Sequence, residues 1–221
     1  MSLKPLTLIS ATPSAYARMN RIALSLKGIP FKLQNEIPWE SKTTTPRYNP
    51  LEKLPILLFP DGRPPIYESA YIQNYIVEKY ADRGPLLLPG DVDGNLLAKQ
   101  IVALSVGSLD ALVLVVWEMR RKKELQSQKW IDRQMRKADG AMRAFNDYVE
   151  RASDRNYVLG KELTIADIGI MCAVGGLDFL GLRPEWKSQH PSLNEYFTRL
   201  DKLKPFEDTR LAMFDITEEV V

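Results

Sequence analysis

The chain of 221 residues is long enough for one large domain or two small ones. Its composition, 45% apolar and 26% charged, is that of a soluble globular protein. Its 30 basic and 28 acidic residues give a net charge of +2, which excludes an overall field that recruits nucleic acid or an anionic membrane.

The chain has too few cysteines and histidines for a disulfide, a redox pair or a metal site built on them. The one cysteine, Cys172, excludes an internal disulfide, a CxxC redox pair and a cysteine-based zinc site, and its apolar neighbours indicate a buried thiol. The one histidine, His190, builds neither a metal site nor a catalytic triad by itself. The N-terminus lacks the apolar core of a signal peptide, and the longest apolar run, 111–117, is far short of the ~20 residues of a membrane helix. We therefore expect a cytoplasmic protein without a bound metal or a membrane span.

Short strands and helices alternate over the first 83 residues. The predicted elements are a strand over 6–10, a helix marked by apolar residues between 19 and 26 and stopped by Gly28, an extended segment over 31–37, a loop with a short helix over 38–50, a hairpin over 53–69, and a helix over 72–80. This order predicts a small mixed sheet with helices packed on it.

The hairpin KLPILLFPDGRPPIYES has two features that a plain hairpin does not need. Pro-Asp-Gly between its apolar runs is typical of a tight turn. Pro55 opens the first strand, where proline removes a ladder donor and where the Leu54–Pro55 bond is a candidate for the cis form. Glu68 and Ser69 close the second strand, immediately before a helix.

Beyond a proline- and glycine-rich linker over 84–92, every pattern is helical. Apolar residues repeat at helical spacing over 101–119 and 131–149. Thr164 and Asp167 form a short capping box ahead of a helix that is apolar on nearly all sides, which predicts a buried centre. Ser192 is the predicted cap of a last helix, with apolar residues up to Leu203 facing inward. We therefore divide the chain into domains at 1–83 and 93–221, joined by the linker.

Three features of the first domain converge on one edge of its predicted sheet. A helix start after Glu68 favours a carboxylate, Ser69 adds a hydroxyl and Glu68 accepts an ammonium, a set that suits the zwitterionic end of an amino acid. A cis Pro55 would expose the backbone of Leu54 to a peptide-like ligand. Ser14, at the start of the first helix, would stabilise an anion such as a thiolate. For both serines the alternative is a plain helix cap.

The order and spacing of these motifs resemble the cytosolic glutathione transferase family over nearly the whole chain. NPLEKLPILLFPDGRPPIYES is similar to the family's glutathione-binding segment, and GPLLLPGD and LTIAD stand where the family has its linker and capping box. SLDALVLVVWEMRR, CAVGGLDF and QHPSLNEYFTRLDKLKPFEDTR resemble a bacterial-type subgroup. That subgroup commonly has Ser-Pro-Phe-Val-Arg at the first helix, where this chain has SAYAR with Ala15 in place of proline. The resemblance implies a thioredoxin-like N-terminal domain (βαβαββα, mixed four-stranded sheet), an all-helical C-terminal domain and a homodimer.

The resemblance also implies which residues bind glutathione. Glu68 and Ser69 would hold the γ-glutamyl end, and the Leu54 backbone, set by Pro55, would pair with the cysteinyl amide. Lys53 and Lys42 would meet the glycyl carboxylate.

The remaining implied roles concern the sulfur, the dimer and the second substrate. Ser14 would hydrogen-bond the sulfur as thiolate. Asp110 would either reach the γ-glutamyl amine of the partner subunit or be a partly buried acid within its own helix bundle. Tyr16 and Trp117 would either line a pocket for an electrophile or be packing aromatics. Trp39 and Tyr48 would belong to the dimer interface or to a lid over glutathione.

The implied activity is attack of the glutathione thiolate on a small electrophile, with glutathione as co-substrate. A serine at position 14 cannot form a mixed disulfide, so the nucleophile is glutathione itself. Two alternatives stay open: a glutathione-dependent disulfide reductase, and a non-catalytic binding module with the same fold.

Overall fold

A computed structural model describes residues 3–152, 156–218 and 220. In its first part, strands β1 (Leu6–Ser10), β2 (Phe31–Asn35), β3 (Ile56–Leu58) and β4 (Ile66–Tyr67) alternate with helices α1 (Ala15–Leu26) and α2 (Ser69–Lys79), and a single 3₁₀ turn, η1 (Thr45–Arg47), lies between β2 and β3. The strands form one mixed sheet in the order β2-β1-β3-β4, with β1 parallel to β2 and the other pairs antiparallel. The predicted element order and the mixed four-stranded sheet are confirmed.

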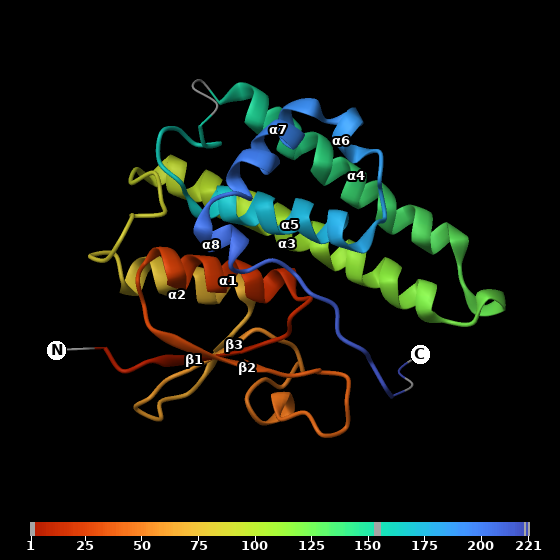
Figure 1. Ribbon diagram of the computed structural model, residues 1–221, viewed down its shortest axis with the longest axis horizontal. Helices are drawn as coiled ribbons and strands as arrows, with labels where there is room; N and C mark the ends of the chain where they lie inside the picture. The colour runs from red at the N-terminus through yellow and green to blue at the C-terminus, as the bar shows by residue number, and fades with distance from the viewer. Residues whose placement is uncertain (1–2, 153–155, 219, 221) are drawn as a thin grey trace.

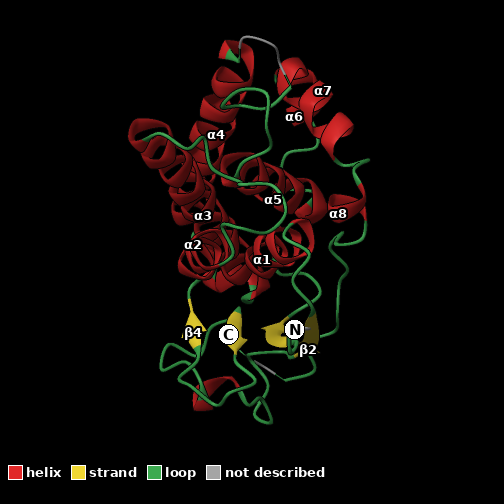
Figure 2. Ribbon diagram, turned by 90° about the vertical axis from the view of Figure 1, so that its left-hand side faces the viewer, coloured by secondary structure: helices red, strands yellow, loops and turns green. Residues whose placement is uncertain are grey.

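Helices α1 and α2 cover one face of the sheet and separate it from the helical part (Figure 2). The apolar stripe of α1 explains this position, because Met19, Ile22 and Ala23 are completely buried between the sheet and the helices beyond. Gly28 follows α1 with a φ of 62°, a left-handed conformation that glycine adopts readily.

The second part is entirely helical among the described residues. Its helices are α3 (Val92–Arg120), α4 (Gln128–Arg151), α5 (Ile165–Leu180), α6 (Trp186–Gln189), α7 (Pro191–Leu200) and α8 (Lys204–Glu207), with a 3₁₀ turn η2 (Lys123–Leu125) between α3 and α4. Figure 1 shows α5 running through the middle of this bundle, with α3 and α4 beside it.

Helix α5 is the buried centre that its sequence predicts. Every residue from Ile165 to Leu177 is buried, and the capping box between Thr164 and Asp167 is present. A β-carbon at Gly169 would lie 2.9 Å from the hydroxyl of Ser105, so this glycine allows α3 to approach α5 closely.

Helix α3 is long and apolar enough to cross a membrane by length and composition alone. It packs against both α4 and α5, and it buries residues such as Ile101, Leu109 and Leu112 there. This position as a core helix of the bundle accounts for its apolar composition.

Three sequence-based expectations are wrong in detail. Helix α7 starts at Pro191 with His190 as its cap, because proline suits the first helical position, and Ser192 instead donates a hydrogen bond to Glu150. Leu203 lies beyond α7 and is 37% exposed, so it does not face inward. Leu54 does not lie at a lateral edge of the sheet, because β3 is flanked on both sides by β1 and β4.

Candidate functional site

The strand register brings the predicted ligand-binding segments to one end of the sheet. Ile9, near the end of β1, pairs with Ile56 at the start of β3, and Ile56 also pairs with Tyr67 at the end of β4. The loops that leave β1, β2 and β4 and the loop that enters β3 therefore lie at the same end. The predicted ligand-binding segments thus meet at one end of the sheet, in the loops that connect the strands.

Ser14 is a helix cap, and its hydrogen bonding leaves a further function open. Its side-chain oxygen accepts a hydrogen bond from the backbone N–H of Ala17 at 3.1 Å, as expected of an N-cap. The hydroxyl is half-buried, and it still has its own proton to donate. Capping and thiolate binding are therefore compatible, because they use different parts of the same hydroxyl group.

The sequence left two roles open for Ser69, a hydroxyl that binds a ligand or a plain helix cap, and in the structure it is not the cap. It is the first residue of α2, and Glu68 takes the cap position without a side-chain cap bond. The Ser69 hydroxyl is buried and donates to the backbone oxygen of Tyr16 at 2.9 Å, which ties α2 to α1. Glu68 is exposed, with a φ of 77° that only a minority of non-glycine residues adopt. The structure therefore turns the Ser69 hydroxyl inward and leaves the Glu68 carboxylate outward.

Tyr16 links this corner to the helical domain. Its hydroxyl donates to a carboxylate oxygen of Asp110, on α3, at 2.6 Å. Burial, followed by the hydrogen bond to Asp110 and the charges of Asp110 and Glu68, raises the pKa of Tyr16 far above its usual value. Tyr16 is therefore a neutral donor, and its backbone and side chain connect α1 to both Ser69 and Asp110. Asp110 is exposed and bonded to α1, so it is not the partly buried acid of a helix bundle.

The remaining predicted glutathione-binding residues lie at the start of β3 and in the loop after β2. The Leu54–Pro55 peptide bond is cis, as the sequence suggested, and Leu54 lies just ahead of the first strand pair at Ile56. The side chain of Lys53 is exposed. Lys42 is also exposed and pairs with the buried carboxylate of Glu40 at 3.1 Å.

The two aromatic residues predicted to line a pocket, Tyr16 and Trp117, each contact a different side chain. Tyr16 bonds to Asp110, whereas Trp117 packs edge-on against Trp39 with 4.7 Å between the ring centroids. Trp39 also lies against Phe214 of the C-terminal segment. Trp39 therefore joins the loop after β2 to the helical domain within one chain.

Two polar residues near this site were not singled out from the sequence. Arg18 on α1 is almost fully buried and donates to the backbone oxygen of Phe206, in α8, at 3.0 Å. Glu36, just after β2, accepts from the hydroxyls of three consecutive threonines, Thr43, Thr44 and Thr45. The run TTT after an acid was a visible signal, but only the loop geometry brings the two together.

The charge of Glu36 is strongly stabilised. Burial alone would raise the pKa of this carboxyl, but the hydrogen bonds donated by Thr43, Thr44 and Gln34 lower it to about 2. Glu36 is therefore ionised at neutral pH and fixes the loop 43–45.

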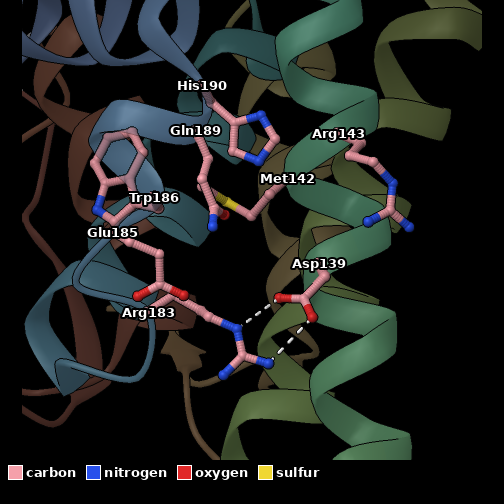
Figure 3. Close-up of a pocket in the computed structure, with 8 residues that line it drawn as sticks. All are labelled: Asp139, Met142, Arg143, Arg183, Glu185, Trp186, Gln189 and His190. Carbon is pink, nitrogen blue, oxygen red and sulfur yellow. Dashed lines mark hydrogen bonds and ion pairs between the residues drawn. The ribbon is translucent and has the colours of Figure 1, made fainter.

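A cavity of about 280 Å³ lies elsewhere, on the outer side of the helical domain. Figure 3 shows the ion pair between Asp139 of α4 and Arg183 at one side of it, with Met142, Trp186 and His190 around the rest. It shares no residue with the end of the sheet, and its paired charges leave no strong preference for a cation or an anion. The candidate functional site is the sheet end, where the polar groups of several elements meet.

Cys172 and His190 are outside the site. Cys172 is completely buried, and burial raises the pKa of its thiol to about 12, so it is inert as predicted. His190 caps α7, and burial lowers its pKa. Among residues 3–152, 156–218 and 220, no three His, Cys, Asp or Glu side chains are placed to hold a metal ion.

Comparison with known families identifies this arrangement. Residues 13–79 match the model of the glutathione S-transferase N-terminal domain, and residues 128–199 match that of the C-terminal domain. The chain belongs to the glutathione transferase family. Its sheet and the helices on it are the family's thioredoxin-like domain, and the bundle is the helical domain that follows.

Solved structures of family members superpose over nearly the whole chain. A glutathione S-transferase from Methylobacterium radiotolerans, in complex with glutathione sulfonate, is 41% identical with a TM-score of 0.91, and the match covers 99% of this chain and 100% of that one. One from Methylobacillus flagellatus, with glutathione bound, is 27% identical with a TM-score of 0.85 over 94% of this chain and 100% of its own. The GST-like protein YibF of Escherichia coli is 29% identical over 91% of this chain and 96% of its own length.

Proposed function

We propose that this family member is a glutathione transferase that catalyses attack of the glutathione thiolate on a small electrophilic carbon. The observation that carries this proposal is the geometry of Ser14. It stands at the start of α1, where the helix dipole favours an anion, and it keeps a hydroxyl proton to donate to sulfur. Stabilising the thiolate raises its fraction at neutral pH, and holding both reactants together supplies further acceleration.

The γ-glutamyl end of glutathione would bind at the start of α2. The exposed Glu68 carboxylate suits its ammonium, and the first N–H groups of α2, from Ser69 onward, suit its carboxylate. Because the Ser69 hydroxyl already donates to Tyr16, we assign Ser69 two parts: its backbone N–H meets the ligand and its side chain fixes α2 on α1. Asp110, held by Tyr16 on the exposed face of α3, would meet the γ-glutamyl amine of the partner subunit.

The peptide part of glutathione would lie along the start of β3. The backbone of Leu54, ahead of cis-Pro55 and outside the strand ladder, would pair with the cysteinyl amide. Lys53 and Lys42, both exposed, would meet the glycyl carboxylate. The electrophile would enter between the domains, beside Tyr16 and Trp117.

A homodimer would place Asp110 near the two-fold axis. The residues exposed on one face of α3 repeat at intervals of four and three: Leu96, Gln100, Ala103, Gly107, Asp110 and Leu114. A β-carbon at Gly107 would meet nothing within 4 Å, so this face leaves room for a second helix to approach closely. We propose that this face contacts the partner subunit, and that the dimer acts in the cytoplasm.

Disulfide reduction is the second candidate activity, and one observation restricts its mechanism. Cys172 is buried with a raised thiol pKa, and position 14 is a serine. The attacking sulfur in any disulfide exchange would therefore have to be that of bound glutathione.

Calorimetric titration with reduced glutathione, followed by turnover assays with haloarene, enone, epoxide and disulfide substrates, tests the proposal. We expect saturation at about one equivalent per chain and glutathione-dependent consumption of a carbon electrophile. Turnover of disulfides alone would favour the reductase. Binding without turnover would favour a binding module, and no binding at millimolar glutathione would refute the proposed function.

A further inference from the structure

The C-terminal segment 211–218 leaves the helical domain at α8 and runs back beside the sheet (Figure 1). It contacts three consecutive residues of the loop after β2. Phe214 lies against Trp39, with 6.5 Å between ring centroids, and Thr217 donates to the carboxylate of Glu40 at 3.2 Å. The next residue of that loop, Ser41, is likewise held, by Glu218.

The contact between Glu218 and Ser41 uses both oxygens of the carboxylate. One accepts the backbone N–H of Ser41 and the other accepts its hydroxyl, each at 2.9 Å. Such a two-point contact fixes the direction of the backbone as well as its position. The residue that follows in the chain is Lys42.

The contact with Glu40 bears directly on Lys42. Glu40 is buried, and one of its carboxylate oxygens accepts from Thr217 while the other pairs with the ammonium of Lys42 at 3.1 Å. Lys42 itself is 82% exposed. Thr217, Glu40 and Lys42 thus form a chain of contacts that runs from the C-terminal segment to a cation on the surface.

The loop is held equally on the other side of Lys42. Glu36 bonds to Thr43, Thr44 and Thr45, and its carboxyl stays ionised down to acid pH. Lys42 therefore projects from the one position between two fixed segments, 39–41 and 43–45. Among the described residues, segment 39–41 is held by the C-terminal segment, outside the thioredoxin-like domain, whereas segment 43–45 is held by Glu36 within it.

The C-terminal segment is itself anchored to that domain. Just before it, Arg18 of α1 donates to Phe206 and Thr209, and at its start the backbone N–H of Ala212 donates to the backbone oxygen of Thr12 at 3.2 Å. Thr12 is two residues before Ser14. The segment therefore passes the start of α1 before it reaches the loop, and it connects the proposed sulfur position at Ser14 to the proposed position of the glycyl carboxylate at Lys42.

From these contacts we infer that Thr217 and Glu218 are positioning residues for glutathione: the C-terminal segment holds Lys42 where its ammonium meets the glycyl carboxylate. This inference rests on the proposed function, which gives Lys42 its ligand. The physical reason is preorganisation. Thr217 fixes the Glu40 carboxylate with which Lys42 pairs, and Glu218 fixes the backbone of Ser41 next to Lys42, so the lysine loses less conformational freedom when it meets the ligand.

The test compares Thr217→Val and Glu218→Gln with Asp215→Asn as a matched control. Asp215 is an exposed acid of the same segment, and it makes no hydrogen bond with the described residues. Calorimetry measures binding of two ligands, glutathione and γ-glutamylcysteine, which lacks the glycine. We expect Thr217→Val and Glu218→Gln to weaken glutathione binding about fivefold each, to leave γ-glutamylcysteine binding unchanged, and to add no further loss to that of Lys42→Ala.

Hydrogen exchange of residues 37–45 gives a readout that does not depend on glutathione, and we expect faster exchange in both variants than in the control. Unchanged exchange would overturn the inference whatever the ligand data. Equal weakening of both ligands would also overturn it, since the segment would then act on the fold as a whole. Failure of the unmodified protein to bind glutathione would refute the proposed function instead. The two outcomes are distinguishable because the unmodified protein is titrated before any variant.

Discussion

Replacing Ser14 by alanine separates the helix cap that the structure shows from the thiolate contact that we propose for the same hydroxyl. Loss of the bond from the Ala17 N–H removes a helix cap, which costs about 1 kcal/mol of unfolding free energy. Loss of the donated proton removes a hydrogen bond to a thiolate, which is worth about 1.5–3 kcal/mol, or about one to two pKa units. We therefore expect bound glutathione in Ser14→Ala to titrate one to two units higher than in the unmodified protein.

Ser14→Gly is the matched control for this experiment. Glycine at a cap costs only a few tenths of a kcal/mol, so the unfolding free energy should nearly recover while the thiol pKa stays raised. The thiolate is followed by its ultraviolet absorbance as pH rises, and stability by urea unfolding. If the thiol of bound glutathione in both variants titrates at the pH found for the unmodified protein, Ser14 is a cap and nothing more.

Four further predictions concern other parts of the molecule. Ser69→Ala leaves the Tyr16 carbonyl without its hydrogen bond and should lower the unfolding free energy by about 1 kcal/mol, measured by urea unfolding. It should also weaken glutathione binding, measured by calorimetry. Unchanged values would show that the hydrogen bond between α1 and α2 has no effect. Asp167→Asn should cost about 3 kcal/mol in the same unfolding assay, because the buried Asp167 carboxylate accepts from several buried donors. Glu36→Gln should destabilise the protein by about 1–2 kcal/mol at neutral pH, a value reduced for partial solvent exposure. Because the folded pKa of Glu36 is lowered to about 2, the unfolding free energies of the variant and the unmodified protein should converge as pH falls from about 4.5 towards 2. Gly107→Arg should convert the proposed dimer to a monomer in light scattering, and a dimer that persists would exclude this face of α3.

Most of the secondary structure and its order could be read from the sequence because the signals are local, but the short helices α6 and α8 were not predicted. Apolar spacing predicts α1, α3 and α4 from residues only three and four positions apart, and Thr164 with Asp167 predicts the start of α5 in the same way. The cap of α7 was misplaced at Ser192, since Pro191 at the first helical position makes His190 the cap and moves the start of the helix two residues earlier.

The candidate site could be predicted only in part. Ser14, cis-Pro55 and the pair Glu68–Ser69 stand out because a helix start and a proline bond restrict the backbone locally. What each hydroxyl bonds to was beyond the sequence: Ser69 turns inward to an oxygen 53 positions earlier in the chain.

The sequence by itself determined the order of the strands and of the helices of ten residues or more, the buried centre at α5 and the residue types at the site, all of which follow from spacing along the chain. Only the tertiary structure decided that Tyr16 bonds to Asp110, that Arg18 anchors α1 to α8, and that Glu218 reaches Ser41. These contacts join residues 94 to 188 positions apart. Such pairs leave no periodic signal, because their meeting depends on how the two domains pack and on the path of the C-terminal segment across them.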